Sequence, residues 1–190
     1  MYNYVNYDHG PVGNAIFNAT LRASAFLRRH MWLYWVLQFT WGILGTAGGA
    51  LIALACLIVG GKPSRHHSHF VVTIGNNWGG LECGCGMVVS DRMGEAWTEH
   101  TKNHEAGHNF QNAVWGPFAL ILFSAPSAVR YWIQRARLAR GDGKKNKPYD
   151  SAYFEDAASV VGELFYGTLA GRGAKSLLKG EKENDSEKGA

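Results

Sequence analysis

The sequence predicts an α+β protein associated with a membrane, and three stretches of the chain carry this prediction. The first runs from Met31 to Gly61 without a charged residue and is long enough for one N-terminal transmembrane helix. The second, residues 69–90, is rich in glycine and β-branched residues and predicts a small β-hairpin or meander. The third, residues 93–111, has the pattern of a helix and contains an HExxH motif. A proline-broken apolar segment and a C-terminal helix complete the predicted fold.

The composition limits the class of protein to which the chain can belong. A length of 190 residues suits one domain, or one domain with an appendage. Seven Trp, eight Tyr and nine Phe exclude disorder for the bulk of the chain. The formal net charge of +4 is modest, so we expect no nucleic-acid partner. Three cysteines, at positions 56, 83 and 85, are too few for a disulfide framework.

Residues 1–30 form an N-terminal segment that ends in a basic cluster, and residues 31–61 are the predicted transmembrane anchor. The anchor exceeds the roughly 20 apolar residues that a helix needs to cross the hydrocarbon layer. Its first third is crowded with aromatic residues, as expected at a membrane boundary. Gly45 and Gly49 form a GxxxG pair, which predicts a helix–helix partner. Because the N-terminal segment is long, a retained anchor is favoured over a cleaved signal peptide.

The basic residues that flank the anchor leave its orientation almost balanced. Arg28 and Arg29 precede the anchor, and Lys62 and Arg65 follow it. When all the basic residues after Gly61 are counted, the positive-inside rule favours a cytoplasmic C-terminal part. We therefore expect an integral membrane protein, in contact with membrane lipid, whose functional part lies on the cytoplasmic side.

Residues 62–170 form the predicted functional domain, which opens with strands near residues 69–74 and 87–90. Asn and Gly residues between these strands supply turns. Three histidines at the start of the domain, His66, His67 and His69, form a candidate metal cluster or else belong to a polar loop that leaves the membrane.

The HExxH motif consists of His104, Glu105 and His108 with two residues between the last two. On a helix, two histidines four residues apart lie on one face and can bind a single metal ion, for which zinc is the usual choice. Glu105 follows the first histidine and lies close enough to take a proton from water that the metal has activated. The motif therefore predicts a zinc site with Glu105 as the catalytic carboxylate.

A catalytic zinc ion needs a third protein ligand, and the sequence offers several acidic residues beyond the motif: Asp142, Asp150, Glu155, Asp156 and Glu163. The pair of motifs His104-Glu105-x-x-His108 and Glu155-Asp-Ala-Ala resembles the glutamate-type zinc metallopeptidases, the gluzincins. In that family a second helix carries the third ligand as Glu-x-x-Ala. The resemblance implies that Glu155 is the third zinc ligand and that Ala158 leaves room for the two helices to pack closely.

Two further resemblances cover other parts of the chain. Residues 112–132 and 77–81 resemble small uncharacterised bacterial and phage membrane proteins that carry the same HExxH motif. Site-2 proteases also place their HExxH motif beside a membrane helix, but this sequence lacks their Leu-Asp-Gly ligand motif.

A second charge-free run, residues 106–129, lies between the histidines and Glu155 and creates a conflict of topology. If it crossed the bilayer, Glu155 would lie on the opposite side from His104 and His108. Pro117 and Pro126 divide it into pieces shorter than a membrane span requires. We therefore expect residues 112–132 to form a re-entrant or interfacial segment, followed by a basic run that lies along anionic lipid.

The combined prediction is a membrane-anchored, zinc-dependent peptidase that hydrolyses a peptide or protein substrate. Tyr149, Tyr153 and His100 are candidates for stabilising the oxyanion of the transition state. A non-enzymatic membrane scaffold is the alternative, and a metal-handling protein that uses all of its histidines is a third possibility. The tail, residues 171–190, has the composition of a disordered segment.

Overall fold

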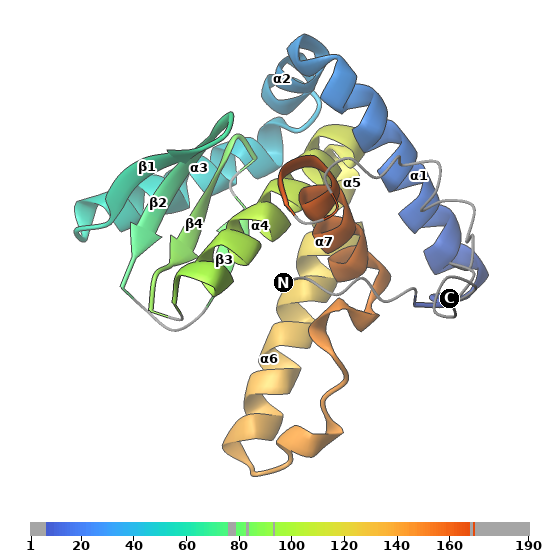
Figure 1. The fold of residues 1–190 in the computed structure, drawn as a ribbon, viewed down its shortest axis with the longest axis vertical. Coiled ribbons are helices and arrows are strands. Elements are labelled where there is room, and N and C mark those ends of the chain that lie inside the picture. Colours follow the sequence, from blue (N-terminus) through green and yellow to red (C-terminus); the bar gives the residue numbers. More distant parts are fainter. Residues whose placement is uncertain (1–6, 76–78, 83, 93, 168, 170–190) are drawn as a thin grey trace, which may run out of the picture.

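A computed structural model describes residues 7–75, 79–82, 84–92, 94–167 and 169 of the chain, so the predicted disordered tail lies outside the described residues. The protein is of the mixed α+β class, with a four-stranded sheet among several helices (Figure 1). The principal helices are α1 (Gly10–Arg29), α2 (Met31–Phe39), α3 (Ile43–Ile58), α4 (Glu95–Trp115), α5 (Pro117–Ala119), α6 (Ala125–Ala139) and α7 (Tyr153–Tyr166). The strands are β1 (Lys62–His66), β2 (His69–Ile74), β3 (Gly80–Glu82) and β4 (Gly86–Ser90).

The sheet has the order β1-β2-β4-β3, which makes β3 an edge strand. The predicted strands at 69–74 and 87–90 are present, but β2 and β4 pair in parallel and therefore do not form a hairpin with each other. The hairpin is instead formed by β1 and β2, and β3 pairs antiparallel with β4. Strand β1 lacks the β-branched residues by which a strand is recognised in sequence, and β3 has only three residues.

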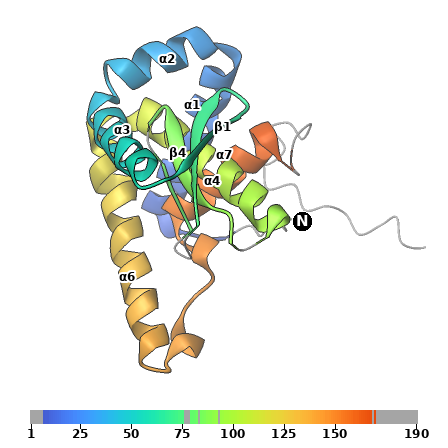
Figure 2. The same ribbon diagram turned by 90° about the vertical axis from the view of Figure 1, so that its left-hand side faces the viewer.

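Both faces of the sheet are covered by helices, as Figure 2 shows for α3 and α4. Val72 and Val88 pack against Ala53 of α3, whereas Val71 and Met87 face α4. Successive residues of a strand point to opposite faces, so one run of valines supplies both interfaces.

The predicted single anchor helix is wrong in its geometry, because residues 31–61 form two helices. The axes of α2 and α3 are bent by 80° at a short break. Within the part of the chain that the structure describes, no single helix has the length and apolar character to cross a membrane, and only the bent pair α2–α3 passes that test together.

Side chains from α4 hold this bend in place. The amide nitrogen of Asn112 donates to Gln38 Oε1 at 2.6 Å and to the carbonyl oxygen of Gly42 at 3.0 Å. Gly45 packs so closely on Asn112 that a Cβ atom there would overlap its side chain. One glycine of the GxxxG pair therefore contacts this same chain.

The second charge-free run also differs from the predicted broken segment. The chain breaks once, at Gly116, whose φ is +54°, and then continues from α5 through a π-helix (Leu120–Ser124) into α6. Pro126 does not interrupt this helical run. Proline has no N–H for the carbonyl of Leu122 four residues earlier, but the Tyr153 hydroxyl donates to that carbonyl at 2.8 Å.

Candidate metal centre

The centre forms where α4 crosses α7, and small residues allow the two helices to approach closely. A Cβ atom on Gly107 of α4 would overlap the backbone of Ala158, and one on Gly162 of α7 would overlap the backbone of Asn103. Residues on the facing sides of the two helices are consequently brought into direct contact although they are about 50 positions apart in sequence.

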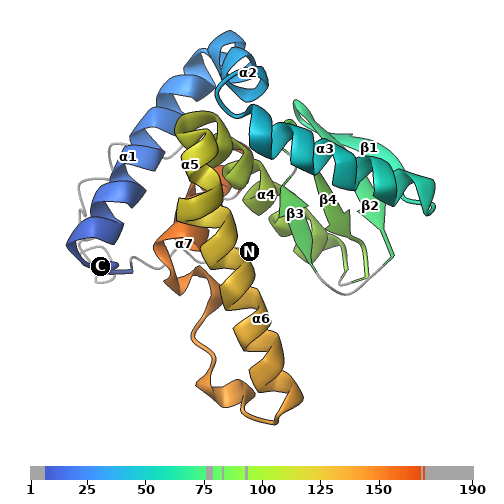
Figure 3. The ribbon, with the colours of Figure 1, turned by 180° about the vertical axis from the view of Figure 1, so that it is seen from behind.

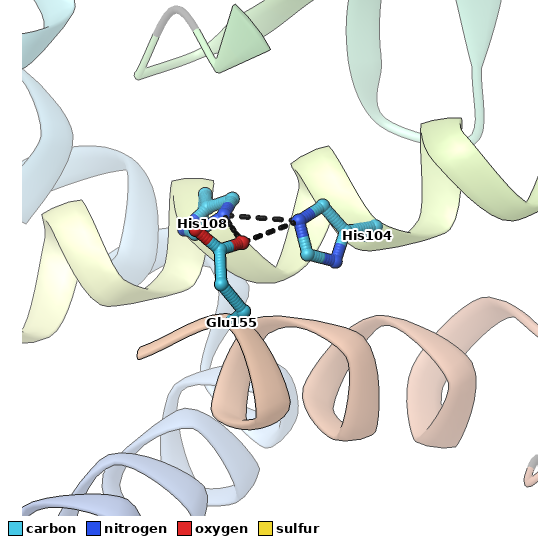
Figure 4. A group of neighbouring side chains, drawn as sticks. All are labelled: His104, His108 and Glu155. Atoms are coloured by element: carbon cyan, nitrogen blue, oxygen red, sulfur yellow. Dashed lines mark hydrogen bonds and ion pairs between the residues drawn. The ribbon is translucent and has the colours of Figure 1, made fainter. Parts of the chain in front are cut away.

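His104 and His108 point from α4 toward Glu155 of α7 (Figure 4). The Nε2 atoms of the two histidines are 3.1 Å apart. Glu155 Oε2 lies 3.1 Å from Nε2 of His104 and 3.3 Å from Nε2 of His108. Among the described residues this is the one group of three or more His, Cys, Asp or Glu side chains whose ligand atoms converge as a metal site requires.

The separations of the three ligand atoms match those around a zinc ion. Zinc–nitrogen and zinc–oxygen bonds of about 2.0–2.1 Å in a tetrahedron place neighbouring ligand atoms roughly 3.3 Å apart. The set of two imidazoles and one carboxylate is also one that catalytic zinc uses, with a fourth position left for solvent or substrate. The residues present therefore fit a zinc ion.

Hydrogen bonds at the Nδ1 atoms orient both rings toward the centre. His108 Nδ1 lies 2.7 Å from Gln111 Oε1, and the amide nitrogen of Gln111 donates to the carbonyl of Phe154 at 2.8 Å. Since that Gln111 oxygen can only accept, His108 donates from Nδ1 and a neutral ring keeps the Nε2 lone pair for a metal. His104 Nδ1 lies 2.8 Å from Ser159 Oγ. Neither partner is predicted from the sequence above, although Gln111 lies one helical turn from His108.

In the absence of a metal ion, Glu155 and His108 stabilise each other's charged forms. Burial by itself would raise the pKa of Glu155, but hydrogen bonds from His104 and His108 outweigh it and hold that pKa well below its usual range. Burial would likewise lower the pKa of His108, yet the hydrogen bond and charge of Glu155 raise it to about 9. The second carboxylate oxygen, Glu155 Oε1, is buried and has no hydrogen-bond partner among the described residues.

Glu105 lies beside the cluster and beneath the edge strand β3. It is buried, and burial raises the pKa of its carboxyl group, against an opposing effect of His104 and His108. The backbone N–H of Glu82 donates to this carboxylate, and a Cβ atom on Gly80 would overlap it. Glu105 is thus held between the candidate metal ligands and strand β3.

Only one of the three oxyanion candidates adjoins the cluster. The Tyr149 ring lies 6.1 Å from that of His104, and burial with the charge of Glu155 raises the pKa of Tyr149 well above its usual value. The Tyr153 hydroxyl is used by the carbonyl of Leu122, and His100 Nδ1 lies 2.9 Å from Glu163 Oε1.

The other acidic candidates for the third ligand whose side chains are described form ion pairs away from His104 and His108. Asp156 pairs with His9 at 2.8 Å, Asp142 pairs with Lys145 at 3.1 Å, and Glu163 contacts His100. The side chain of Asp150 lies outside the described residues.

Each histidine at the start of the domain contacts a different residue, although the ring centroids of His66 and His67 are 4.5 Å apart. His66 Nε2 lies 2.8 Å from Asn103 Oδ1, and His67 stacks on the ring of Tyr166. His69 is fully buried, with Nδ1 facing the amide of Asn109. These three histidines do not converge on one point in the described structure.

Comparisons with protein families, with curated proteins and with solved structures find no match to this chain.

Proposed function

We propose that the chain is a zinc-dependent peptidase of gluzincin type. The observation that carries this proposal is the triangle of ligand atoms from His104, His108 and Glu155, with separations of 3.1–3.3 Å. Their mutual spacing suits tetrahedral zinc, and both imidazoles are oriented by partners at Nδ1.

Zinc at such a site supplies a Lewis acid for the substrate carbonyl and lowers the pKa of water. Glu105 accepts a proton from the attacking water, whose oxygen bonds to the carbonyl carbon. When the carbon–nitrogen bond breaks, Glu105 returns that proton to the leaving amine. The Tyr149 hydroxyl is the candidate donor to the oxyanion, because its ring adjoins His104.

The edge strand supports a peptide rather than a compact small molecule as the substrate. Among the described strands, β3 is an edge strand that pairs with β4, and its residue Gly80 packs against Glu105. Because the backbone N–H of Glu82 in β3 donates to Glu105, an extended peptide that docks beside this strand would pass its backbone close to the carboxylate and the ligands.

The test compares zinc content and peptide hydrolysis in purified full-length protein. Glu105→Gln should retain one zinc ion per chain and lose hydrolysis of a fluorogenic peptide library by roughly 10²–10⁴-fold. His104→Ala should lose both zinc and activity. Glu99→Gln serves as the matched control, because Glu99 lies on the same helix with an exposed side chain.

Two results would contradict the proposal. One is a wild-type protein that binds no zinc after exposure to it. The other is hydrolysis that Glu105→Gln leaves as high as in Glu99→Gln. Zinc binding without any hydrolysis would instead indicate a structural metal site.

A further inference from the structure

Helix α6 buries none of its residues, and its two faces differ sharply. Its polar face contacts the segment that returns to α7: Arg130 donates to the carbonyl of Pro148 at 2.6 Å, and Gln134 donates to that of Lys147 at 3.2 Å. Its apolar face includes Trp132, which is 68% exposed. The described part of the chain therefore satisfies the polar side of this helix and leaves its apolar side uncovered.

The uncovered side of α6 continues onto neighbouring helices. Figures 2 and 3 show α3, α5 and α6 on one side of the molecule. We call this side the apolar face, and its large exposed side chains are Ile43, Leu44, Leu51, Ile52, Leu54, Ile58, Phe118, Leu120, Ile121, Val129, Trp132 and Ile133. So many exposed apolar side chains on adjoining helices mark a surface that contacts something other than water.

The distribution of charge indicates what this surface contacts. No Asp or Glu occurs in residues 9–81 or 106–141, which include α1, α2, α3, α5 and α6. The same stretches contain nine basic residues: Arg22, Arg28, Arg29, Lys62, Arg65, Arg130, Arg135, Arg137 and Arg140. Helices that carry basic but no acidic residues complement anionic lipid, whereas a second copy of the chain would bring like charges together.

The bend between α2 and α3 determines how the chain can meet a bilayer. Gln38 is fully buried and its amide donates to the carbonyls of Gly84 and Asn109, both at 2.7 Å. Asn112 donates to Gln38 and to the carbonyl of Gly42, within the break. Straightening α2 and α3 into one spanning helix would remove these bonds from buried groups.

We propose that the apolar face, α3 with α5 and α6, lies in one leaflet of an anionic bilayer and that neither charge-free run crosses it. The residues before α2 and those after α3 then remain on the same side of the membrane as the metal centre. This inference goes beyond the proposed peptidase function and does not rest on it.

Flotation of the full-length protein with vesicles tests the lipid contact. Binding to vesicles that contain one-third phosphatidylglycerol should exceed binding to pure phosphatidylcholine and should weaken with added salt. Trp132→Glu combined with Ile121→Glu should reduce binding by about tenfold or more. Val12→Glu is the control, because Val12 is 73% exposed but lies on α1, outside the apolar face.

Equal loss in the control and face variants would overturn the assignment of the surface. A protein that binds no vesicles but forms a dimer that Trp132→Glu dissociates would also overturn it, and would assign the face to a second copy.

The single-leaflet arrangement is tested separately by labelling. In full-length chains whose native cysteines are replaced, a cysteine at Arg29 or at Lys62 is introduced and exposed to a membrane-impermeant maleimide outside sealed vesicles. Cysteines at both positions should be labelled to the same extent, because both lie on the same side of the membrane. Labelling from opposite sides would show that residues 31–61 cross the bilayer and would overturn the proposal.

Discussion

Helices α4 and α6 distribute polar and apolar residues in opposite ways. From Asn103 to Ala113 every residue of α4 is buried, and seven of these eleven residues are polar or charged. In α6 no residue is buried, although it carries Trp132 and Ile133. Hydrophobicity alone therefore does not decide burial in this protein.

The buried polar helix is stable because its side chains have specific partners. Gln111 connects His108 to the backbone of Phe154, and Asn112 connects α4 to the bend at Gly42. A buried polar group costs little when it is hydrogen-bonded and much when it is not. The polar side of α6 also has such partners, in Pro148 and Lys147, but Trp132 on its apolar side is 68% exposed, so that side gains little stabilisation from the described residues.

The largest loss of stability is expected when the contact between the polar helix α4 and α7 is disturbed. Gly162→Ala places a Cβ atom against the backbone of Asn103, which cannot rotate away. The free energy of unfolding in urea should therefore fall by at least about 3 kcal/mol. Gly48→Ala is the control: nothing lies near Gly48 in α3, and alanine there should stabilise the helix by about 0.5–1 kcal/mol. Equal stability of the two variants would contradict the close packing.

The buried histidine on the sheet should make stability depend on pH. Burial, together with the charges of His66, His67 and Arg28, lowers the pKa of His69 to about 4, below its value of about 6.5 in an unfolded chain. As the pH falls from about 6.5 to 4, the unfolded chain binds the proton first, so the fold should lose about 2–3 kcal/mol.

The measurement is the free energy of urea unfolding between pH 7 and pH 4 for the wild type and for His69→Asn. Carboxylates titrate in both proteins, so the difference between the two curves isolates His69. Parallel curves would mean that the pKa of His69 is the same in the folded and the unfolded chain.

A smaller effect is expected from the residues that orient the ligands. Gln111→Leu removes the acceptor at His108 Nδ1 and should weaken zinc binding by about 10–100-fold without removing any ligand. Competition with a zinc chelator measures this change, and Gln134→Leu, on exposed α6, should leave the affinity unchanged. An unchanged affinity in Gln111→Leu would show that packing alone orients the ring.

The sequence predicts the elements that local interactions determine, and it does not predict the features that distant residues determine. The HExxH helix and strand β2 depend on local spacing and residue type, and both are present. The bend at residues 40–42 depends on Asn112, seventy positions away, and the passage of α6 through Pro126 depends on Tyr153. No pattern within the segments themselves carries this information.

Part of the candidate site was predictable, because several of its residues follow one another at the four-residue interval of a helix. His104 and His108 are one turn apart, and the same interval from Glu155 reaches Ser159, the partner of His104. The association of Glu105 with β3 was not predictable, because this three-residue strand is an edge strand that has its place only through β4. His104 and His108 were therefore predictable from their spacing and Glu155 from the resemblance to gluzincins, whereas the strand beside them was not.

The smallest change in the free energy of unfolding is expected for the apolar face. This change gives the most direct contrast with the buried helix α4. Trp132→Gln exchanges a side chain that is 68% exposed, so the free energy of unfolding in detergent solution should change by less than about 0.5 kcal/mol. The buried Asn112→Leu, which retains approximate size but removes the amide bonded to Gln38 and Gly42, should cost about 1–3 kcal/mol. Urea titrations of both variants measure the contrast. If Trp132→Gln destabilised the fold as much as Asn112→Leu, the ring would be packed within the chain rather than free to contact lipid.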